Sequence, residues 1–568
     1  MSLLYEDYYQ EIKDGNGKIC EIRTTYGRHF NFAYDVVDRF AKEDPEKLAM
    51  VHKSAEGVTT RVTFGELMRR SNQAANVFFG LGIRRHDSVM LLCKRRLEYW
   101  IAILALHKMG AVAIPTSHMV SAKDIEERGL VSHMKAVVCV NSEHICANVL
   151  EGTKNLDVVN LVIGDEFPGM LPFAKLLEGA SDVWERVDTD VEDDMLYYFT
   201  SGTSGAPKAV IHDFSYPIAH IYTAKNWHGM QDGDLHLTVA DTGWAKSAWG
   251  KLYGQWFVGA AIMVYDYEQF YAGDLLKVLE EEGVNTFCAP PTIYKYLVLE
   301  DVSKVDLSKL RHVSTAGEPM PREVARKFKE MTGLTVREGF GQTETALQIC
   351  TDVSCPVREG SLGKASPLYH MELVDEDGNQ VAPGEEGEIV ILPDGLNQKD
   401  DERFDASTSK RGVPRRTPLG ILKGYLGDDT LYEDVWKDGV YHTRDKAKMD
   451  SDGYFYFVGR NDDVIKSSGY RIGPSEVEDL LMKHPAVFEC AVTAYPSRNR
   501  GALVKATIIL RPGYEKTQQL KTQLQDFVKE RAAIYKYPRR IEFVDELPRT
   551  SNGKISRAMI RKKDYGLL

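Results

Sequence analysis

The sequence lacks the features of several special classes of protein. Its eight cysteines are scattered along 568 residues and form no CxxC pair, and Cys350 and Cys355 have no second pair nearby. This spacing does not fit a zinc ribbon or a disulfide framework, so we expect reduced and mostly buried thiols. The most apolar helical stretch, residues 99–106, is far too short to span a bilayer. We therefore expect no membrane span.

Positive charge is also scarce. Lysine and arginine number 71 against 83 acidic residues, which gives a formal net charge of -12 and a pI near 5.8. General affinity for nucleic acid is not expected from this balance, so an anionic ligand must be met by local donors. The opening residues, MSLLYEDYYQEIKDG, have neither the basic start nor the apolar run of a signal peptide. These observations predict a cytoplasmic protein that takes small molecules from solution.

What is present is an alternation of short apolar runs and amphipathic stretches. Residues 48–52, 88–93 and 111–115 have the composition of strands, whereas residues 64–81 and 98–109 have helical spacing of apolar positions. A strand, a helix and a further strand in this order predict a βαβ crossover and a parallel sheet. Hydrophobic residues make up 43% of the chain, which is ordinary for a globular protein.

The pattern changes twice along the chain. From about residue 360 short β-rich segments alternate with turns, and residues 397–416 read as a polar surface excursion. A turn at residues 459–463 precedes a compact α+β unit. We predict an α/β fold with a large N-terminal region, residues 1–461, made of βαβ subdomains and a β-rich subdomain. A small C-terminal domain, residues 462–568, completes it.

The most distinctive stretch is the strand at residues 195–199 and the loop that follows it. The loop, TSGTSGAPK, offers hydroxyls, two glycines and Lys208, a composition that lets backbone N–H groups approach a polyphosphate closely. Its G-x-x-G-x-x-K spacing is not that of a Walker A loop. The alternative is a Ser/Gly-rich turn that ends in a lysine by chance. The loop alone favours phosphate binding only modestly.

Four further polar turns follow apolar runs, and the chain closes with Gly553-Lys554 in an exposed turn. The four turns are STAGEP at residues 314–319, REGFGQTE at 337–344, YHTRD at 441–445 and the segment 459–471. Each turn alone is a weak signal, but their order and spacing are highly specific. Together they resemble the adenylate-forming superfamily of acyl-CoA synthetases, nonribosomal adenylation domains and luciferases, over nearly the whole chain.

Within that superfamily, IKSSGYRIGPSEVE and AIYKYPRRIEFVDELPRTSNGKISR are most similar to medium-chain acyl-CoA synthetases, those of archaea in particular. The resemblance implies two half-reactions. A carboxylate attacks the α-phosphate of Mg-ATP to give an acyl-adenylate and pyrophosphate, and the thiol of coenzyme A then displaces AMP. It also implies a mobile C-terminal domain that rotates between one pose for each step, and it admits a homodimer.

The resemblance assigns roles to residues of this sequence. It places ATP phosphates at Thr200, Ser201, Gly202, Thr203, Lys208 and Thr343, the adenine and ribose at Gly317, Glu318, Pro319, Glu338, Gly339, Phe340, Asp445 and Arg460, and Mg²⁺ at Glu344. It places the hinge at Asp462 and coenzyme A at Ser468, Gly469, Tyr470, Arg471, Arg500, Lys529 and Tyr537. For Asp445 and Arg460 the alternatives are a capped turn and a surface ion pair, and for Arg500, Lys529 and Tyr537 ordinary surface roles are nearly as good an explanation.

Lys554 is the predicted catalytic residue. Attack on an α-phosphate gathers negative charge, and a cation delivered by a small domain stabilises that state without a covalent step. The alternative is a solvated lysine in a tail, which is the usual situation of a lysine.

Two departures from the family pattern concern the acyl group and the backbone. Acetate-specific relatives have a tryptophan where this chain has Gly341, so we expect that a wall of the acyl pocket is missing and that a longer or branched acid enters. The predicted pocket residues are Trp227, Trp244, Lys246, Trp249, Cys288, Ala316 and Gly341. Lys246 is unusual in an apolar pocket, and it either faces the coenzyme, pairs with a carboxylate or lies outside. Arg444 replaces a glycine that many relatives have before the aspartate.

The sequence therefore predicts an AMP-forming acyl-CoA synthetase for a short-to-medium carboxylic acid, with branched acids included. An aryl acid of the benzoate type is the nearest alternative. A catalytically silent homologue that binds nucleotide is the alternative from another class, and intact Lys554, Glu344 and Asp445 speak against it.

Overall fold

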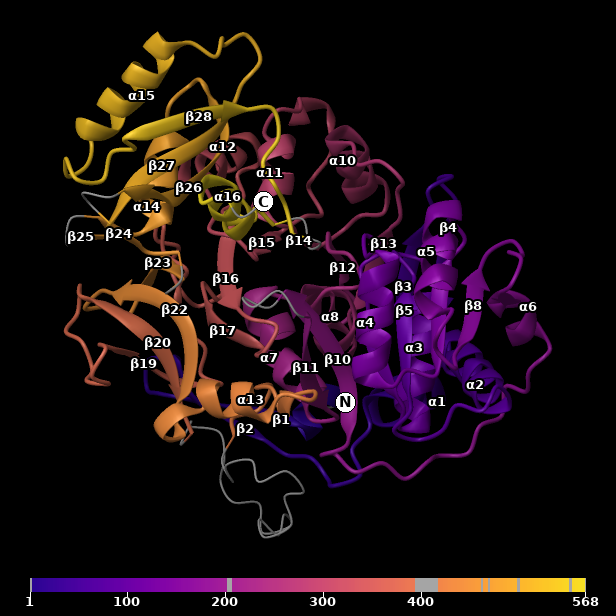
Figure 1. The fold of residues 1–568 in the computed structure, drawn as a ribbon. Coiled ribbons are helices and arrows are strands. Elements are labelled where there is room, and N and C mark those ends of the chain that lie inside the picture. Colours follow the sequence, from indigo (N-terminus) through magenta and orange to yellow (C-terminus); the bar gives the residue numbers. More distant parts are fainter. Residues whose placement is uncertain are drawn as a thin grey trace.

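The computed structural model describes residues 3–201, 207–393, 417–460, 463–467, 470–497, 501–550 and 554–566. The predicted surface excursion at residues 397–416 lies outside these ranges. Figure 1 shows a large region built from three sheets and a smaller domain, coloured orange to yellow, at its C-terminal end. This arrangement confirms the predicted α/β fold class.

The first sheet carries the predicted parallel crossovers. The strand order is β21 (Gly424–Tyr425), β11 (Pro207–Asp213), β10 (Asp194–Ser201), β6 (Val112–Pro115), β5 (Ser88–Leu92), β7 (Ala136–Val140), β8 (Val159–Ile163) and β9 (Leu171–Pro172). Strands β6, β5, β7 and β8 run parallel, whereas β10 and β11 form an antiparallel pair. The helices that connect or follow these strands are α2 (Phe64–Gly80), α3 (Glu98–Met109), α4 (Ala122–Ser132), α5 (Glu143–Thr153) and α6 (Phe173–Glu178).

The second sheet has the order β18 (Lys364–Ala365), β17 (Leu347–Cys350), β16 (Arg337–Gly341), β15 (His312–Ala316), β14 (Thr286–Cys288), β12 (Leu235–Thr238), β13 (Ala261–Tyr265), β3 (Leu48–Lys53) and β4 (Thr59–Thr63). Its helices are η2 (Ala33–Asp38), α1 (Arg39–Glu43), α7 (Tyr216–Tyr222), η3 (Thr223–Trp227), α8 (Ala245–Lys251), α9 (Tyr253–Phe257), α10 (Ala272–Glu281), α11 (Pro291–Leu297), η4 (Val302–Lys304) and α12 (Arg322–Thr332). Strands β14, β15 and β16 are parallel neighbours, so their carboxyl ends meet at one edge.

A third, antiparallel sheet has the order β19 (His370–Val374), β20 (Glu386–Leu392), β22 (Tyr441–Met449) and β23 (Phe455–Arg460), with α13 (Asp429–Val435) and η6 (Lys437–Gly439) beside it. Near the N-terminus, η1 (Leu4–Asp7) precedes a hairpin of β1 (Tyr9–Lys13) and β2 (Ile19–Thr24). The β-rich texture predicted after residue 360 is therefore confirmed.

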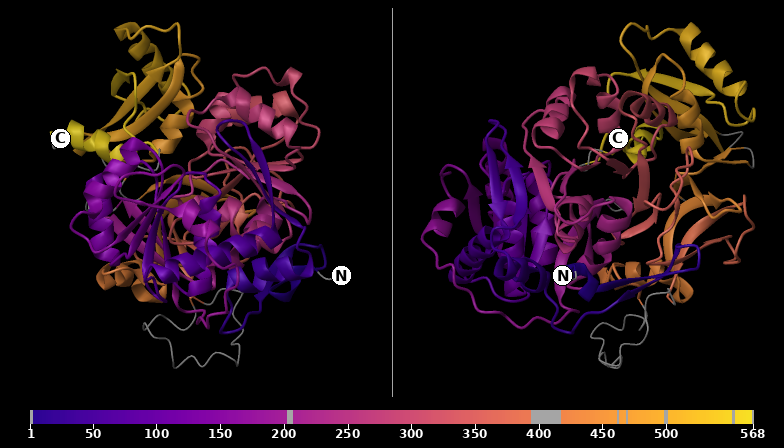
Figure 2. Two further views of the ribbon diagram at one scale, coloured as in Figure 1. Left: turned by 90° about the vertical axis from the view of Figure 1, so that its right-hand side faces the viewer. Right: turned by 180° about the vertical axis from the view of Figure 1, so that it is seen from behind.

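The C-terminal domain is an α+β unit with its own core. Its sheet has the order β25 (Tyr470–Ile472), β24 (Ile465–Ser467), β27 (Gly501–Leu510) and β26 (Val487–Ser497), and β28 (Arg540–Val544) runs parallel to β27. Its helices are α14 (Pro474–Leu481), α15 (Gln518–Lys529) and α16 (Arg557–Asp564). Helix α14 packs against β23 of the large region, and Figure 2 shows the domain seated at one end of the molecule.

The first two sheets share one hydrophobic core. Every residue of α3 after Glu98 is buried, as expected for a helix that is apolar all round and enclosed between layers. Buried aromatic residues such as Trp100 and Trp256 fill the space between the sheets. In the part of the chain that the structure describes, no helix combines the length and the apolar character needed to cross a bilayer.

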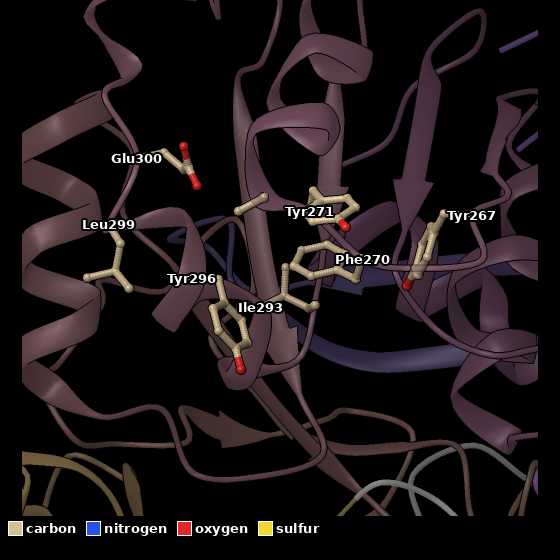
Figure 3. Close-up of a pocket in the computed structure, with 8 residues that line it drawn as sticks. Tyr267, Phe270, Tyr271, Ile293, Tyr296, Leu299 and Glu300 are labelled. Carbon is tan, nitrogen blue, oxygen red and sulfur yellow. The ribbon is translucent and has the colours of Figure 1, made fainter. Parts of the chain in front are cut away.

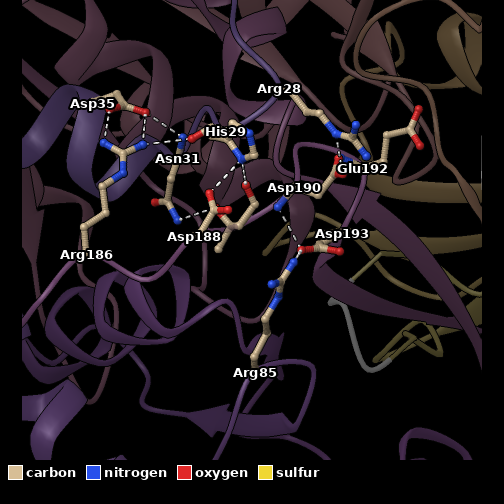
Figure 4. A network of polar contacts seen from close by, with 11 residues as sticks. Arg28, His29, Asn31, Asp35, Arg85, Arg186, Asp188, Asp190, Glu192 and Asp193 are labelled. Carbon is tan, nitrogen blue, oxygen red and sulfur yellow. Dashed lines mark hydrogen bonds and ion pairs between the residues drawn. The ribbon is translucent and has the colours of Figure 1, made fainter. Parts of the chain in front are cut away.

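A network of polar contacts fixes the segment that leads into β10 (Figure 4). Arg186 pairs with Asp35, and Arg28 pairs with Asp190 at 2.9 Å. Arg85 donates to Asp193, the residue before the strand. These contacts join residues that lie more than a hundred positions apart, so β10 enters the sheet from a fixed point.

Candidate active site

The predicted phosphate loop belongs to a hairpin. Thr200 at the end of β10 lies opposite Lys208 in the antiparallel register, and Pro207 already begins β11. The interpretation of Lys208 as a loop residue is therefore wrong, because its backbone continues the sheet and pairs with β10. Gly202 and Thr203 lie outside the described residues, as does the side chain of Ser201.

Strand β11 also ties this hairpin to the turn after β16. The imidazole Nε2 of His212 lies 2.8 Å from the carbonyl oxygen of Thr343. Burial lowers the pKa of His212 to about 3, so the ring is neutral at physiological pH. Thr343 is thus held between two sheets. Sequence reasoning did not identify His212.

The carboxyl ends of β15 and β16 form the floor of the site. The backbone turns sharply after Ala316, where Gly317 has a φ of 105°, a conformation that residues with a Cβ rarely adopt. A Cβ on Gly317 would lie 4.0 Å from Cε of Lys554. The lysine of the small domain therefore reaches the turn that the resemblance assigns to the nucleotide.

Lys554 lies at the end of a short hairpin. The Thr550 N–H donates to the Lys554 carbonyl at 2.8 Å, and Arg549 forms a β-bridge with Ile555. The Lys554 side chain is exposed, yet the protein around it removes enough water to lower its pKa, an effect that Glu318 opposes. The ammonium group therefore lies in the field of the carboxylates of the site.

Asp445 and Arg460 face each other across β22 and β23. They are register partners, with Nε of Arg460 3.8 Å from Oδ1 of Asp445. Gln342 orients the carboxylate, because its Nε2 donates to Oδ2 of Asp445 at 2.6 Å and to the Thr443 carbonyl at 2.7 Å. Burial raises the pKa of Asp445 to about 6, although Arg460 acts in the opposite direction. No motif of the sequence had assigned a role to Gln342.

Two further glutamates of the predicted site accept hydrogen bonds. Oε1 of Glu344 accepts a hydrogen bond from the Tyr425 hydroxyl at 3.1 Å, and Oε2 of Glu338 accepts one from the Met320 N–H at 3.1 Å. Burial raises the pKa of Glu338 to about 8. Among the described residues no group of three or more His, Cys, Asp or Glu side chains could hold a metal ion alone. A single carboxylate such as Glu344 suits Mg²⁺ that arrives with phosphate oxygens and water.

The remaining nucleotide residues lie nearby in the chain but differ in exposure. Pro319 is exposed and Glu318 is half-buried, both in the turn after β15. The ring of Phe340 on β16 lies 5.8 Å from that of Phe457, centroid to centroid. One predicted adenine segment therefore follows β15, and the other lies on β16, the parallel neighbour of β15.

Two tryptophans pack directly on the glycines of β16. A Cβ on Gly339 would lie 2.5 Å from the Trp227 ring, and one on Gly341 would lie 2.5 Å from the Trp249 ring. The two rings meet edge to face, with centroids 6.4 Å apart. Gly341 therefore makes room for the Trp249 ring, and the expectation that a longer or branched acid enters stays a prediction. Trp249 fills the space that a side chain at this position would occupy.

Lys246 lies inside the site rather than outside it. Its Nζ donates to the Ala316 carbonyl at 2.7 Å. Desolvation lowers its pKa, partly offset by Cys288, while Lys554 lowers it further. Trp244 directly precedes the helix that carries Lys246, and Cys288 is buried at the end of β14. Apart from Trp244, the predicted acyl-pocket residues therefore lie on or against β14, β15 and β16.

The residues predicted for coenzyme A are only partly described. Nζ of Lys529 lies 4.6 Å from the Tyr537 ring centroid, and Lys529 pairs with Asp526 at 2.8 Å. The structure does not describe the side chains of Tyr470 and Arg471. It describes no part of Ser468, Gly469 and Arg500, or of the predicted hinge residue Asp462.

A cavity of about 560 Å³ lies apart from these residues, beside α10 and α11 (Figure 3). Half of its lining residues are aromatic, namely Tyr267, Phe270, Tyr271 and Tyr296. None of the residues predicted to bind substrate lines it.

The fold, with a lysine from a small domain brought to the glycine turn of a large one, is that of an adenylate-forming enzyme. The chain belongs to the AMP-binding enzyme family, whose model matches residues 37–396, and the model of the AMP-binding enzyme C-terminal domain matches residues 476–554.

Curated relatives narrow the class. The chain is 36% identical over 548 residues to the human mitochondrial acyl-coenzyme A synthetase ACSM5, covering 95% of this chain and 91% of that one. It is 33% identical to rat mitochondrial ACSM3, covering 99% and 96%. The protein is an AMP-forming acyl-CoA synthetase, an acid–thiol ligase that uses ATP, Mg²⁺ and coenzyme A.

Solved structures agree with this assignment. An acyl-CoA synthetase of Brucella canis is 32% identical, with a TM-score of 0.71 and 95% of both chains covered. An anthranilate CoA ligase in complex with anthranoyl-AMP is 28% identical, with a TM-score of 0.84 and coverage of 95% and 98%. The predicted cytoplasmic location is contradicted, because these curated relatives are named as mitochondrial enzymes.

Proposed function

We propose that this acyl-CoA synthetase activates a short-to-medium carboxylic acid, straight or branched. The observation that carries the proposal is the packing of Trp227 and Trp249 on the glycines of β16. Two indole rings at this place would limit the length of the acyl group, since buried aromatic rings fill large volumes. A long straight chain would have to displace a ring.

The roles of the site residues form part of the proposal. Lys554 would stabilise the transition state of adenylation, Asp445 and Arg460 would hold the ribose, and Glu344 would hold Mg²⁺. Thr200, Lys208 and Thr343 would bind the phosphates. The convergence of Lys554, Asp445 and Glu344 supports these roles over those of a silent nucleotide-binding homologue, because such a protein would need no cation here.

Domain rotation about a hinge near Asp462, at the boundary of residues 1–461 and 462–568, is proposed to bring the coenzyme A residues to the same site. Homodimer formation stays a prediction, which light scattering of the purified protein would test.

An aryl acid is the second candidate. The anthranilate CoA ligase and a benzoate CoA ligase of Burkholderia xenovorans, which is 25% identical with a TM-score of 0.79, are structural relatives. An indole pair that meets edge to face could also receive a flat aromatic acid.

Acid-dependent ATP–pyrophosphate exchange over a panel of straight, branched and aromatic acids tests the proposal. We expect the highest kcat/KM with short-to-medium aliphatic acids, and a shift toward longer acids in Trp249→Leu. Trp256→Leu is a matched control in the core, since Trp256 donates to the Ala49 carbonyl. Highest activity with benzoate would favour the second candidate, and no exchange with any acid would contradict both.

A further inference from the structure

The small domain contacts α11 of the large region through two neighbouring residues of β26. The rings of Phe488 and Tyr296 lie 6.2 Å apart, centroid to centroid. At the adjacent positions, one before Tyr296 and one after Phe488, Nζ of Lys295 lies 3.1 Å from Oε1 of Glu489. Tyr296 also lines the aromatic cavity of Figure 3, and α11 lies beside the yellow domain in Figure 1.

Glu489 is enclosed at this contact. The residue is only 3% exposed, and the Lys295 side chain is 10% exposed, so both charges have lost most of their water. A buried carboxylate is costly unless it is paired and hydrogen-bonded. Such a pair is therefore not an incidental surface contact, whose worth would be small.

The second oxygen of Glu489 holds the hairpin that carries Lys554. Oε2 of Glu489 accepts a hydrogen bond from Nη2 of Arg549 at 2.6 Å. Arg549 stands at the base of that hairpin, where it is bridged to Ile555, and the Ser556 N–H donates to the Pro548 carbonyl at 2.7 Å. One carboxylate thus joins α11 of the large region to the base of the lysine hairpin.

The two partners of Glu489 differ in one respect. Arg549 and Glu489 belong to the same domain, so their contact moves with that domain. Lys295 belongs to the large region, so its contact with Glu489 exists only where the domain sits as it does here, with Lys554 beside Gly317. Loss of Lys295 should therefore affect one arrangement of the domains and not the other.

We propose that Lys295 and Glu489 are positioning residues for the adenylation step. Their ion pair holds the small domain in the arrangement that brings Lys554 to the nucleotide. The proposal rests on the catalytic role of Lys554 and the domain rotation proposed above. In this proposal Lys295 does not contact substrate. It fixes the position of the hairpin that carries Lys554, through Glu489 and Arg549.

The test compares the two half-reactions in the full-length enzyme. Lys295→Gln should lower acid-dependent ATP–pyrophosphate exchange roughly tenfold or more, as expected when one partner of a buried charged pair is removed. It should leave thioester formation from supplied acyl-adenylate and coenzyme A within about twofold of the wild type. Lys295→Arg, which keeps the charge, should recover much of the exchange.

A matched control is Lys304→Gln. Lys304 also lies on the large region, but its side chain is 85% exposed and its ion pair with Asp301 spans 3.9 Å. We expect both half-reactions of this variant to equal those of the wild type. Glu489→Gln, tested in parallel, should lose exchange at least as strongly as Lys295→Gln because it releases Arg549 as well.

The outcomes separate this proposal from the one on which it rests. Normal exchange in Lys554→Ala would overturn the catalytic assignment. Loss of exchange in Lys554→Ala together with normal exchange in Lys295→Gln would overturn the positioning role alone. Equal loss of both half-reactions in Lys295→Gln would also overturn it, since a general structural defect does not distinguish between the two steps.

Discussion

The two lysines assigned to ATP are held in opposite ways. Lys208 lies on a strand that pairs with β10 on one side and β21 on the other, and His212 of the same strand is fixed to Thr343. Lys554 is exposed on a hairpin of the small domain, whose base is held by the Arg549–Glu489 pair. The proposed phosphate-binding groups are therefore built into the sheets, whereas the proposed catalytic cation comes from the small domain, whose rotation we propose.

The largest effect should come from removing Lys554, the proposed catalytic cation of the small domain. Lys554→Ala should lower ATP–pyrophosphate exchange by roughly 10²–10³, because an electrostatic donor to the transition state is lost. The structure of the large region should be unchanged, so the KM for MgATP should change far less than kcat. Steady-state exchange kinetics measure both, and an unchanged kcat would break the comparison.

The next largest effect should come from Asp445, whose carboxylate belongs to the large region. Asp445→Asn should weaken adenosine binding roughly tenfold to a hundredfold, since hydrogen bonds to a charged group are lost. Gln342→Ala should have a smaller effect in the same direction, because Gln342 only orients the carboxylate. Calorimetric titration with adenosine gives both values, and equal affinities in all three proteins would exclude a ribose-binding role.

The raised pKa of Asp445, about 6, gives this binding a pH dependence. Adenosine has no group that titrates between about pH 5 and 8, so its affinity should rise as the pH rises through about 6 and Asp445 ionises. The folding stability of the protein without ligand should change with pH in the opposite direction. Protonated Asp445 contributes stability below its unfolded pKa of about 4, and this contribution is lost as the pH passes about 6. Asp445→Asn should abolish both trends.

A smaller effect is expected from Lys208, the lysine on strand β11 of the large region. Lys208→Ala should raise the KM for MgATP about tenfold or less and leave kcat nearly unchanged, because a phosphate contact made equally in the ground and transition states affects binding alone. A fall in kcat as large as that of Lys554→Ala would show that the two lysines do not differ in kind.

The smallest effect should come from Arg444, next to Asp445. Arg444 has a φ of 62°. This left-handed conformation is uncommon for residues other than glycine, because the side chain strains the backbone. Arg444→Gly relieves that strain but frees the unfolded chain and removes the ion pair with Asp434. We expect the stability to change by less than about 1 kcal/mol, which thermal melting would show. A loss of several kcal/mol would mean that the Asp434 pair holds this turn.

Much of the fold could be predicted from local pattern. The parallel crossovers follow from strands that alternate with helices, and α2 and α3 lie where the spacing of apolar residues placed them. Strand β11 was missed because Pro207 and the glycines before it are typical of a turn, whereas pairing with β10 extends the strand to Pro207.

The site was predictable only where the chain itself carries a motif. Gln342 and Asp445 are 103 positions apart, and His212 and Thr343 are 131 apart, so nothing local indicates that they meet. The same holds for Trp249, whose ring fills the space beside Gly341 although the two lie far apart in sequence. A missing side chain can be replaced by a residue from another element, and sequence alone does not show this.

We propose that Lys554 acts in one half-reaction only, because the small domain that carries it is proposed to rotate away from the site between the two steps. Single-turnover formation of the thioester from supplied acyl-adenylate and coenzyme A by Lys554→Ala tests it most directly. We expect a rate equal to that of the wild type, in a variant that has lost ATP–pyrophosphate exchange. An equal loss of thioester formation would contradict it.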